Sequence, residues 1–205
     1  AANIKAGYYP KEGYFTLSFP TSNVTFCVHT RKQVPEVNRP LATKWNNVGG
    51  GQIVETSQRI EITSTTAANY WVLRSRGNYT FSSSGAEIQL INAGNQALTS
   101  YAAYPVLLEK LGDSNNQLYW AVTGSNVVAD KRINNVFTTV FTAAYVPTTH
   151  KWFRIRESAG NTLWDTSTDG INWTNRASEV SPMSMANLDI IIMVGTDAVE
   201  ASTTT

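Results

Sequence analysis

The stretch HKWFRIRESAGNTLWDTSTDGINWT, residues 150–174, concentrates side chains suited to binding a polar ligand. It holds three tryptophans, two arginines and an Asp-Gly turn. An indole ring offers a flat apolar face, and a guanidinium group offers several hydrogen-bond donors in a fixed fork. The stretch is therefore a candidate ligand surface, and the alternative is a hairpin in which these side chains only hold the strands together.

Alternation along a β-strand divides the segment KWFRIRE into two faces. Phe153 and Ile155 fall on one face, which we predict to be core. Trp152, Arg154 and Arg156 fall on the other face, where water or a polar ligand can meet them. Arginine stacked on tryptophan is also a common structural pair, so both interpretations stay open.

The strand that we expect at QLYWAVT follows the same rule. Alternation places Leu118, Trp120 and Val122 in the core. Gln117 and Tyr119 then lie on the opposite face. Further along the chain, Asp169 and Gly170 form a tight turn, because glycine readily adopts the positive φ that such turns prefer. The tryptophans on either side of that turn, Trp164 and Trp173, are expected to pack on the hairpin.

One loop offers oxygen atoms of the kind that bind metal ions. The segment GDSNNQ, residues 112–117, offers oxygen atoms from Asp113, Asn115 and Gln117. Calcium takes six to eight oxygen ligands and usually several carboxylates, so a hairpin loop with a single acid is the better interpretation. The single Cys27 excludes a cysteine-based zinc site and a disulfide framework. We predict no cofactor, and a structural calcium ion has no support in the sequence.

The composition excludes several classes of partner. The chain is 42% hydrophobic and 15% charged, with a formal net charge of +1, which fits a folded protein with polar loops. A charge this small gives no field that would drive phosphate binding, so nucleic acid is not an expected partner. The sequence also lacks a run of about 18 apolar residues, so membrane insertion is not expected.

Short runs rich in β-branched and aromatic residues recur between clusters of Gly, Asn, Ser and Asp, while helical periodicity is almost absent. The only candidate helix is a short piece near residues 100–111, which contain Pro105. The pattern favours an all-β fold, an antiparallel two-sheet β-sandwich of the jelly-roll type. Strands are predicted near residues 14–18, 24–29, 52–56, 59–63, 70–74, 86–91, 104–109, 117–123, 125–130, 136–142, 151–157, 162–167 and 188–196.

The segment KQVPEVNRPLATKW, with Pro35 and Pro40, is expected to be extended and to join two parts of the chain. We therefore divide the chain into an N-terminal arm with one or two strands, a β-sandwich and a short tail or linker. These parts span residues 1–40, 41–200 and 201–205, respectively.

Two motifs resemble a known family. The pattern W-x-R-I-R-E, a Gly-containing turn and W-x-x-S-x-D-G-x-x-W is similar to the late hairpin of concanavalin A-like lectin/glucanase domains. The segment that begins KWNNVGGGQIVET is similar to the opening strands of the same domains, so the resemblance covers residues 41–196. The most similar versions occur in bacterial surface proteins and in phage tail and baseplate proteins.

The resemblance raises the question of catalysis. Glucanases of this fold carry paired carboxylates in a Glu-x-Asp-x-x-Glu string, and this chain contains no such string. Its two histidines, His29 and His150, lie in different regions, which argues against a Ser-His-Asp arrangement. HExxH and P-loop patterns are absent as well. We therefore predict that the protein is not an enzyme.

The resemblance implies a non-catalytic carbohydrate-binding module of a phage host-adhesion protein, located in the virion or on an extracellular surface. Its expected partner is a cell-surface polysaccharide, and it is expected to belong to a larger chain or a homo-oligomeric assembly. The alternatives are a structural sandwich that spaces or oligomerises such an assembly and, less favoured, a glycan hydrolase. The saccharide is expected to lie across the polar side of one sheet near Gln89, Gln117, Tyr119, Trp152, Arg154, Arg156 and Asp165.

Overall fold

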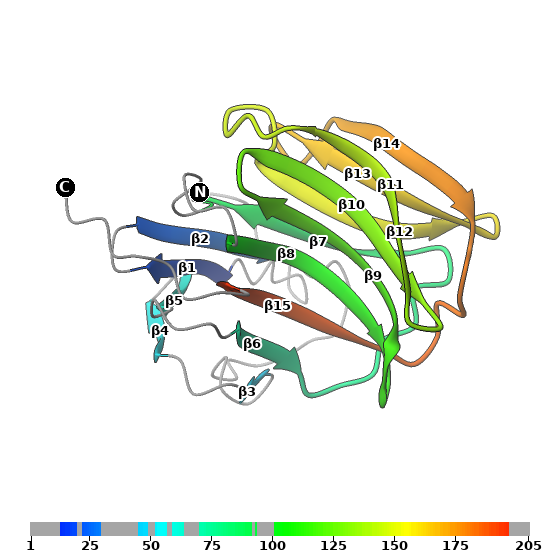
Figure 1. Ribbon diagram of the computed structural model, residues 1–205, viewed down its shortest axis with the longest axis horizontal. Coiled ribbons are helices and arrows are strands. Elements are labelled where there is room, and N and C mark those ends of the chain that lie inside the picture. Colours follow the sequence, from blue (N-terminus) through cyan, green and yellow to red (C-terminus); the bar gives the residue numbers. More distant parts are fainter. Residues whose placement is uncertain are drawn as a thin grey trace, which may run out of the picture.

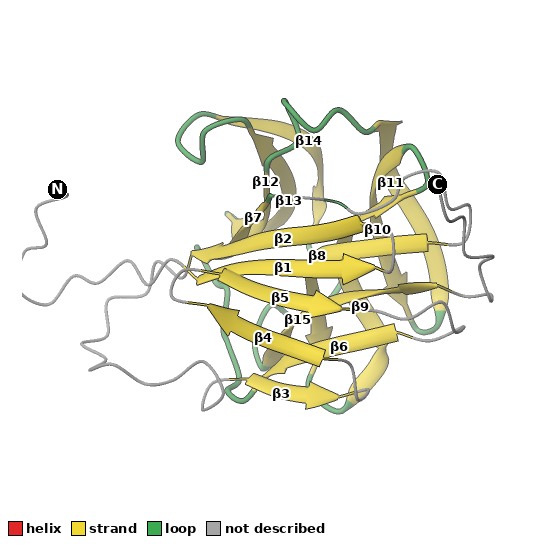
Figure 2. Ribbon diagram, turned by 90° about the vertical axis from the view of Figure 1, so that its left-hand side faces the viewer, coloured by secondary structure: helices red, strands yellow, loops and turns green. Residues whose placement is uncertain are grey.

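The structure is a computed structural model that describes residues 13–19, 22–29, 45–48, 52–56, 59–63, 70–91, 93 and 101–196. These residues form fifteen strands and, within the described part, no helix (Figures 1 and 2). The strands are β1 Gly13–Phe19, β2 Ser22–His29, β3 Trp45–Val48, β4 Gln52–Thr56, β5 Arg59–Thr63, β6 Tyr70–Ser75, β7 Gly85–Leu90, β8 Tyr101–Lys110, β9 Asp113–Thr123, β10 Asn126–Ile133, β11 Val136–Ala144, β12 Trp152–Ser158, β13 Asn161–Ser167, β14 Trp173–Val180 and β15 Leu188–Thr196.

The strands build two sheets that pack face to face. The eight-stranded sheet has the order β14-β13-β12-β7-β2-β1-β5-β4, and the seven-stranded sheet has the order β11-β10-β9-β8-β15-β6-β3. Neighbouring strands are antiparallel except for a short parallel pairing of β1 with β5. The predicted two-sheet antiparallel β-sandwich is therefore confirmed.

Within the first forty residues, the described part forms strands β1 and β2, and both pair within the eight-stranded sheet. Strand β2 pairs with β7 of the later sequence, and β1 pairs with β2 and β5. The side chains of these two strands and the connecting segment before Trp45 lie outside the described residues, as do residues 197–205. The division into arm, sandwich and tail stays a prediction.

Two expectations about individual elements are wrong. The candidate helix near residues 100–111 is strand β8, in which Pro105 lies at a register shift against both neighbouring strands. A bulge is one of the few places where a sheet accepts proline, which has no N–H to donate. Strands β3 and β14 were not expected, because neither WNNV nor WTNRASEV alternates apolar with polar residues.

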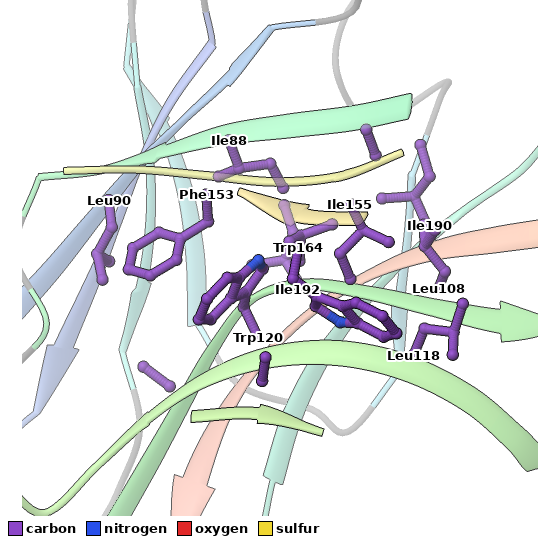
Figure 3. Packing of buried hydrophobic residues seen from close by; sticks show 14 of the residues in the cluster. Ile88, Leu90, Leu108, Leu118, Trp120, Phe153, Ile155, Trp164, Ile190 and Ile192 are labelled. Carbon is purple, nitrogen blue, oxygen red and sulfur yellow. The ribbon is translucent and has the colours of Figure 1, made fainter. Parts of the chain in front are cut away.

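The core lies between the sheets, where the side chains predicted to face inward meet (Figure 3). Phe153, Ile155, Leu118 and Val122 are all 0% exposed, which confirms their prediction. The Trp120 ring is also fully buried, with its centroid 5.6 Å from that of Phe153 in the opposite sheet. Strand alternation therefore identified the inward-facing residues of both sheets.

One tryptophan of the hairpin lies deeper than expected. Trp164 was predicted to pack on the hairpin, and its side chain instead points between the sheets and is fully buried. In the register of the hairpin, it faces Ile155 of β12 on one side and Ala177 of β14 on the other. The hairpin therefore contributes one of its three tryptophans to the core.

Among the described residues there is no helix of the length and hydropathy needed to cross a membrane.

Truncating a buried side chain should destabilise the sandwich more than truncating an exposed side chain does. We expect Ile155→Ala to lower the free energy of unfolding by about 2–5 kcal/mol, because it removes buried methyl groups and leaves a cavity. The matched control is Ile171→Ala at a side chain that is 76% exposed, and it should change stability by less than about 0.5 kcal/mol. Chemical denaturation followed by tryptophan fluorescence measures both. Equal losses in the two variants would contradict this placement of the core.

Candidate functional site

The seven residues predicted to form one binding site lie on two sheets. Gln89, Trp152, Arg154, Arg156 and Asp165 belong to β7, β12 and β13 of the eight-stranded sheet, and we call its outer side here the arginine face. Gln117 and Tyr119 belong to β9 of the seven-stranded sheet. Because the core separates the sheets, the two groups point away from each other, and no single ligand of modest size can touch both.

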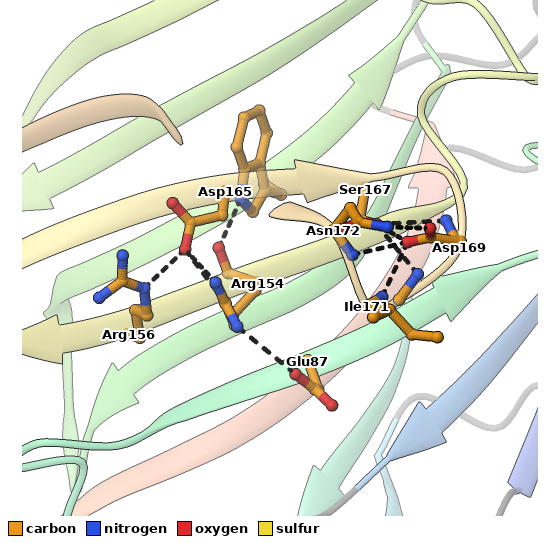
Figure 4. A network of polar contacts seen from close by, with 10 residues as sticks. Glu87, Arg154, Arg156, Asp165, Ser167, Asp169, Ile171 and Asn172 are labelled. Carbon is orange, nitrogen blue, oxygen red and sulfur yellow. Dashed lines mark hydrogen bonds and ion pairs between the residues drawn. The ribbon is translucent and has the colours of Figure 1, made fainter. Parts of the chain in front are cut away.

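A buried carboxylate organises the arginine face (Figure 4). Asp165 is 1% exposed, and its Oδ2 accepts hydrogen bonds from Arg154 Nε at 3.0 Å, Arg154 Nη2 at 2.8 Å and Arg156 Nε at 2.7 Å. Its Oδ1 accepts a bond from the Asn175 amide at 2.9 Å. Glu87 lies 4.0 Å from Arg154 Nη1. Two cations and two carboxylates therefore largely neutralise each other within the surface.

The aromatic rings of this face are partly covered by the protein itself. The Arg154 guanidinium lies over the Trp173 ring, 3.9 Å from its centroid. An Arg–Trp stack was one of the two interpretations of the sequence, but it was considered for Trp152 and not for Trp173. The backbone of Gly170 approaches Trp152 so closely that an added Cβ would lie 2.9 Å from its ring. One face of each ring is therefore unavailable to a ligand.

A second glycine fixes how closely the strands of this face approach. Gly85 of β7 lies opposite Arg156 of β12. A Cβ on Gly85 would lie 2.5 Å from both Arg156 Cβ and the carbonyl oxygen of Ile155, which are backbone-proximal atoms that cannot move aside. Only glycine permits this approach.

The Asp-Gly turn has the structural role predicted for it. The Asp169 carboxylate accepts hydrogen bonds from the backbone N–H groups of Ile171 and Asn172, each at 2.8 Å, and from the Ser167 hydroxyl at 2.9 Å. These donors hold the pKa of Asp169 far below its usual value, because they stabilise the charged form. Gly170 follows with φ +74°, which confirms the prediction of a positive φ.

The outer side of the seven-stranded sheet carries a different chemistry, and we call it the tyrosine face. Tyr70 of β6, Tyr104 of β8 and Tyr119 of β9 form a ladder of edge-to-face rings, with centroids 6.1 Å and 5.4 Å apart. The ladder packs beside a small apolar cluster that includes Leu107 and Ile191. The sequence predicted that Tyr119 points away from the core, and it does so, although it is largely buried among these neighbours.

A row of polar side chains crosses the same face beside the tyrosines. Asp189 of β15 lies opposite Glu109 of β8, and Glu109 lies opposite Gln117 of β9. Arg74 Nη1 contacts Glu109 at 2.7 Å and Asp189 at 2.8 Å, and the Gln117 amide donates to Glu109 at 2.6 Å. The row continues to Arg132 of β10, which lies opposite Gln117.

A third carboxyl group extends the tyrosine face toward β11. Asp130 of β10 lies between Tyr119 of β9 and Thr139 of β11, whose hydroxyl groups favour its charged form. Burial raises the pKa of Asp130, because it disfavours the charged form. Burial beside Asp130 also raises the pKa of the Tyr119 phenol.

In the segment considered for calcium, the single carboxylate is hydrogen-bonded to neighbouring residues of the same segment. Asp113 begins strand β9, and its carboxylate accepts hydrogen bonds from the Asn115 N–H at 3.1 Å and the Asn116 amide at 2.7 Å. Gln117, the third expected oxygen ligand, belongs to the polar row instead. In the described part of the chain, no group of three or more His, Cys, Asp or Glu side chains could hold a metal ion.

Sequence reasoning missed most of the tyrosine face. Tyr70, Arg74, Tyr104, Glu109 and Asp189 come from three strands that are far apart in the chain, and no local motif joins them. Alternation does predict that each of them faces outward, because a neighbouring residue in the same strand faces the core. The missing information was which strands are neighbours.

Comparisons with known proteins find remote similarity to solved structures. No family model and no curated protein matches the sequence. Among solved structures, the chain is similar to carbohydrate-binding module CBM66 from Bacillus subtilis (TM-score 0.49, 13% identity, 76% of this chain and 93% of that one). It is also similar to a β-glucanase from Bacillus licheniformis (TM-score 0.47, 8% identity, 98% and 89%) and to LamAcat from Zobellia galactanivorans (0.44, 7%, 97% and 86%). Similarity at this level assigns neither a ligand nor a reaction to this chain.

Asp165 should matter for stability whatever the arginine face binds. Asp165→Ala leaves two guanidinium groups without their shared partner, so we expect it to lower the free energy of unfolding by about 3 kcal/mol. The control Asn175→Ala removes a neutral donor to the same carboxylate and should cost about 1–1.5 kcal/mol. Urea denaturation of both variants measures the difference. A smaller loss for Asp165→Ala than for Asn175→Ala would contradict the central role of this carboxylate.

Proposed function

We propose that the protein is a non-catalytic carbohydrate-binding module and that its saccharide lies on the tyrosine face. The observation that carries the proposal is the ladder of Tyr70, Tyr104 and Tyr119 beside a row of fixed polar groups. A sugar has apolar C–H faces that stack on flat rings and hydroxyl groups that need oriented donors and acceptors. The tyrosine face supplies both on one side of one sheet.

The arginine face is the weaker candidate, because its rings are partly covered by the protein itself. The Trp173 ring carries the Arg154 guanidinium, and the Gly170 backbone lies against the Trp152 ring. One side of each ring is therefore closed to a sugar. Of the residues first expected to bind, Gln117 keeps that role in the proposal, and the largely buried Tyr119 supports the ring ladder.

The expected affinity of a single site is low. Covering 50–100 Å² of apolar surface, on the order of one tyrosine ring, contributes about 1–3 kcal/mol at about 25 cal/mol/Å². Millimolar binding requires about 4 kcal/mol, so hydrogen bonds to Gln117 and its neighbours must supply the remainder.

Paired carboxylates exist on this face, and their burial and ion pairs argue against hydrolysis. Glu109 and Asp189 lie directly opposite each other on adjacent strands, an arrangement that brings side chains within about 5 Å and suits a retaining glycosidase. However, each residue is only 4% exposed, and both carboxylates are turned onto Arg74. Neither group is presented to a glycosidic bond.

The biological setting that we propose is host adhesion by a phage tail or baseplate, where the module recognises a cell-surface polysaccharide from the virion or an extracellular surface. Its support is the resemblance of the late hairpin, W-x-R-I-R-E followed by the Asp-Gly turn, to modules of such proteins.

A structural spacer is the alternative. A glycan array carrying bacterial surface polysaccharides separates the two, because a spacer binds nothing on it.

Binding should depend on one face and not on the other. We expect Tyr104→Ala to weaken binding of the best array glycan about tenfold, which corresponds to about 1.4 kcal/mol for a lost stacking contact. Trp152→Ala on the arginine face should bind as the unsubstituted protein does. Isothermal titration calorimetry on folded variants measures both. If Trp152→Ala loses binding and Tyr104→Ala does not, the saccharide lies on the arginine face.

The protein should release no reducing ends from the polysaccharide that it binds. The physical reason is that Arg74 occupies both candidate carboxylates. A reducing-sugar assay with prolonged incubation checks this, with Glu109→Gln as the matched variant. Product that forms with the unsubstituted protein and disappears in Glu109→Gln would show that the module is a glycan hydrolase.

A further inference from the structure

Strand β11 forms one edge of the seven-stranded sheet, and the part of it that precedes a bulge lacks the usual protection of such an edge. Within the described residues it pairs only with β10, so its outer side carries no partner strand. Its nine residues, VFTTVFTAA, include no charged residue, no proline and no glycine. Natural edge strands normally carry charges or proline, or are covered, because unpaired N–H and C=O groups recruit other strands.

A bulge divides the strand into two regular runs. The register with β10 shifts between Thr139 and Phe141, so Val140 is an extra residue. Such a bulge twists an edge and hinders pairing at that point. The run Val136–Thr139 before it stays regular, and it carries two large apolar side chains, Val136 and Phe137, that are 65% and 62% exposed.

We infer that the run Val136–Thr139 pairs with the same run of a second copy of this chain. Antiparallel pairing about a two-fold axis requires a strand that complements itself, and an uncharged run of β-branched and aromatic residues places no like charges opposite each other. The formal net charge of +1 adds little repulsion between copies. A partner with a charged strand would gain nothing from β11, which offers it no opposite charge.

The pairing does not depend on the proposed function, but it has a geometric consequence for it. Edge-to-edge pairing joins the two seven-stranded sheets into one continuous sheet, and the two-fold axis runs perpendicular to that sheet. Both tyrosine faces then point to the same side of the dimer. The contact is a short run, so the dimer belongs to the weak class of interfaces and forms at high protein concentration.

Sedimentation equilibrium over a wide range of protein concentrations tests this pairing. A monomer has a mass of 22.5 kDa, and we expect the unsubstituted protein to approach twice that mass as its concentration rises. Thr138→Glu should remain monomeric, because it places a carboxylate in each of the paired runs. The substitution is compatible with the folded monomer, since Thr138 is exposed and lies opposite Lys131 of β10. Phe137→Ser, which removes apolar surface without adding charge, should weaken the dimer.

The control is Thr80→Glu, which adds the same charge at an exposed threonine outside the strands. It should dimerise as the unsubstituted protein does, and thermal unfolding confirms that each variant is folded. A protein that stays monomeric at all concentrations overturns the inference. So does a dimer that survives Thr138→Glu, because its interface then lies elsewhere, and so does an assembly of three copies, because a two-fold edge pairing closes at two.

Discussion

The contact between the two sheets around Trp120 sets which side chains of β12 point into the core and which point outward. The ring of Trp120 projects from the seven-stranded sheet, packs against Phe153, and donates its Nε1–H to the carbonyl oxygen of Arg154 at 3.1 Å. That hydrogen bond joins the sheets at the centre of the core. Because it fixes the β12 backbone with Phe153 inward, Arg154 must point outward, and its guanidinium then meets Asp165 and Trp173.

Much of the fold could be predicted because burial leaves a local trace in the sequence. Strands such as β4, β5 and β15 begin and end where the sequence indicated, and Phe153 and Leu118 are inward as alternation required. The unexpected strand β14 lies at a sheet edge and mixes polar and apolar residues on both sides, so it carries no such trace. In β8, tertiary pairing outweighed the local signal of Pro105.

The candidate site could be predicted only in part, since pairing between distant strands is not written in local sequence. Alternation gave the outward direction of Gln117 and Trp152 correctly, but it could not tell that they belong to different sheets. The pair of Glu109 and Asp189 joins positions eighty residues apart. A search for carboxylates within one strand therefore found none, whereas the sheet places two side by side.

Gly85 and Gly170 make the arginine face less tolerant of mutation than the tyrosine face. Any side chain at either position would collide with Arg156 or Trp152, so the hairpin of the arginine face has little freedom to evolve. Tyr70 and Gln117, by contrast, project from ordinary strand positions on the other sheet, where one residue can replace another without moving the backbone. A lineage could therefore exchange side chains such as Tyr70 and Gln117 one at a time, and with them the ligand proposed for the tyrosine face, without disturbing the hairpin on the other sheet.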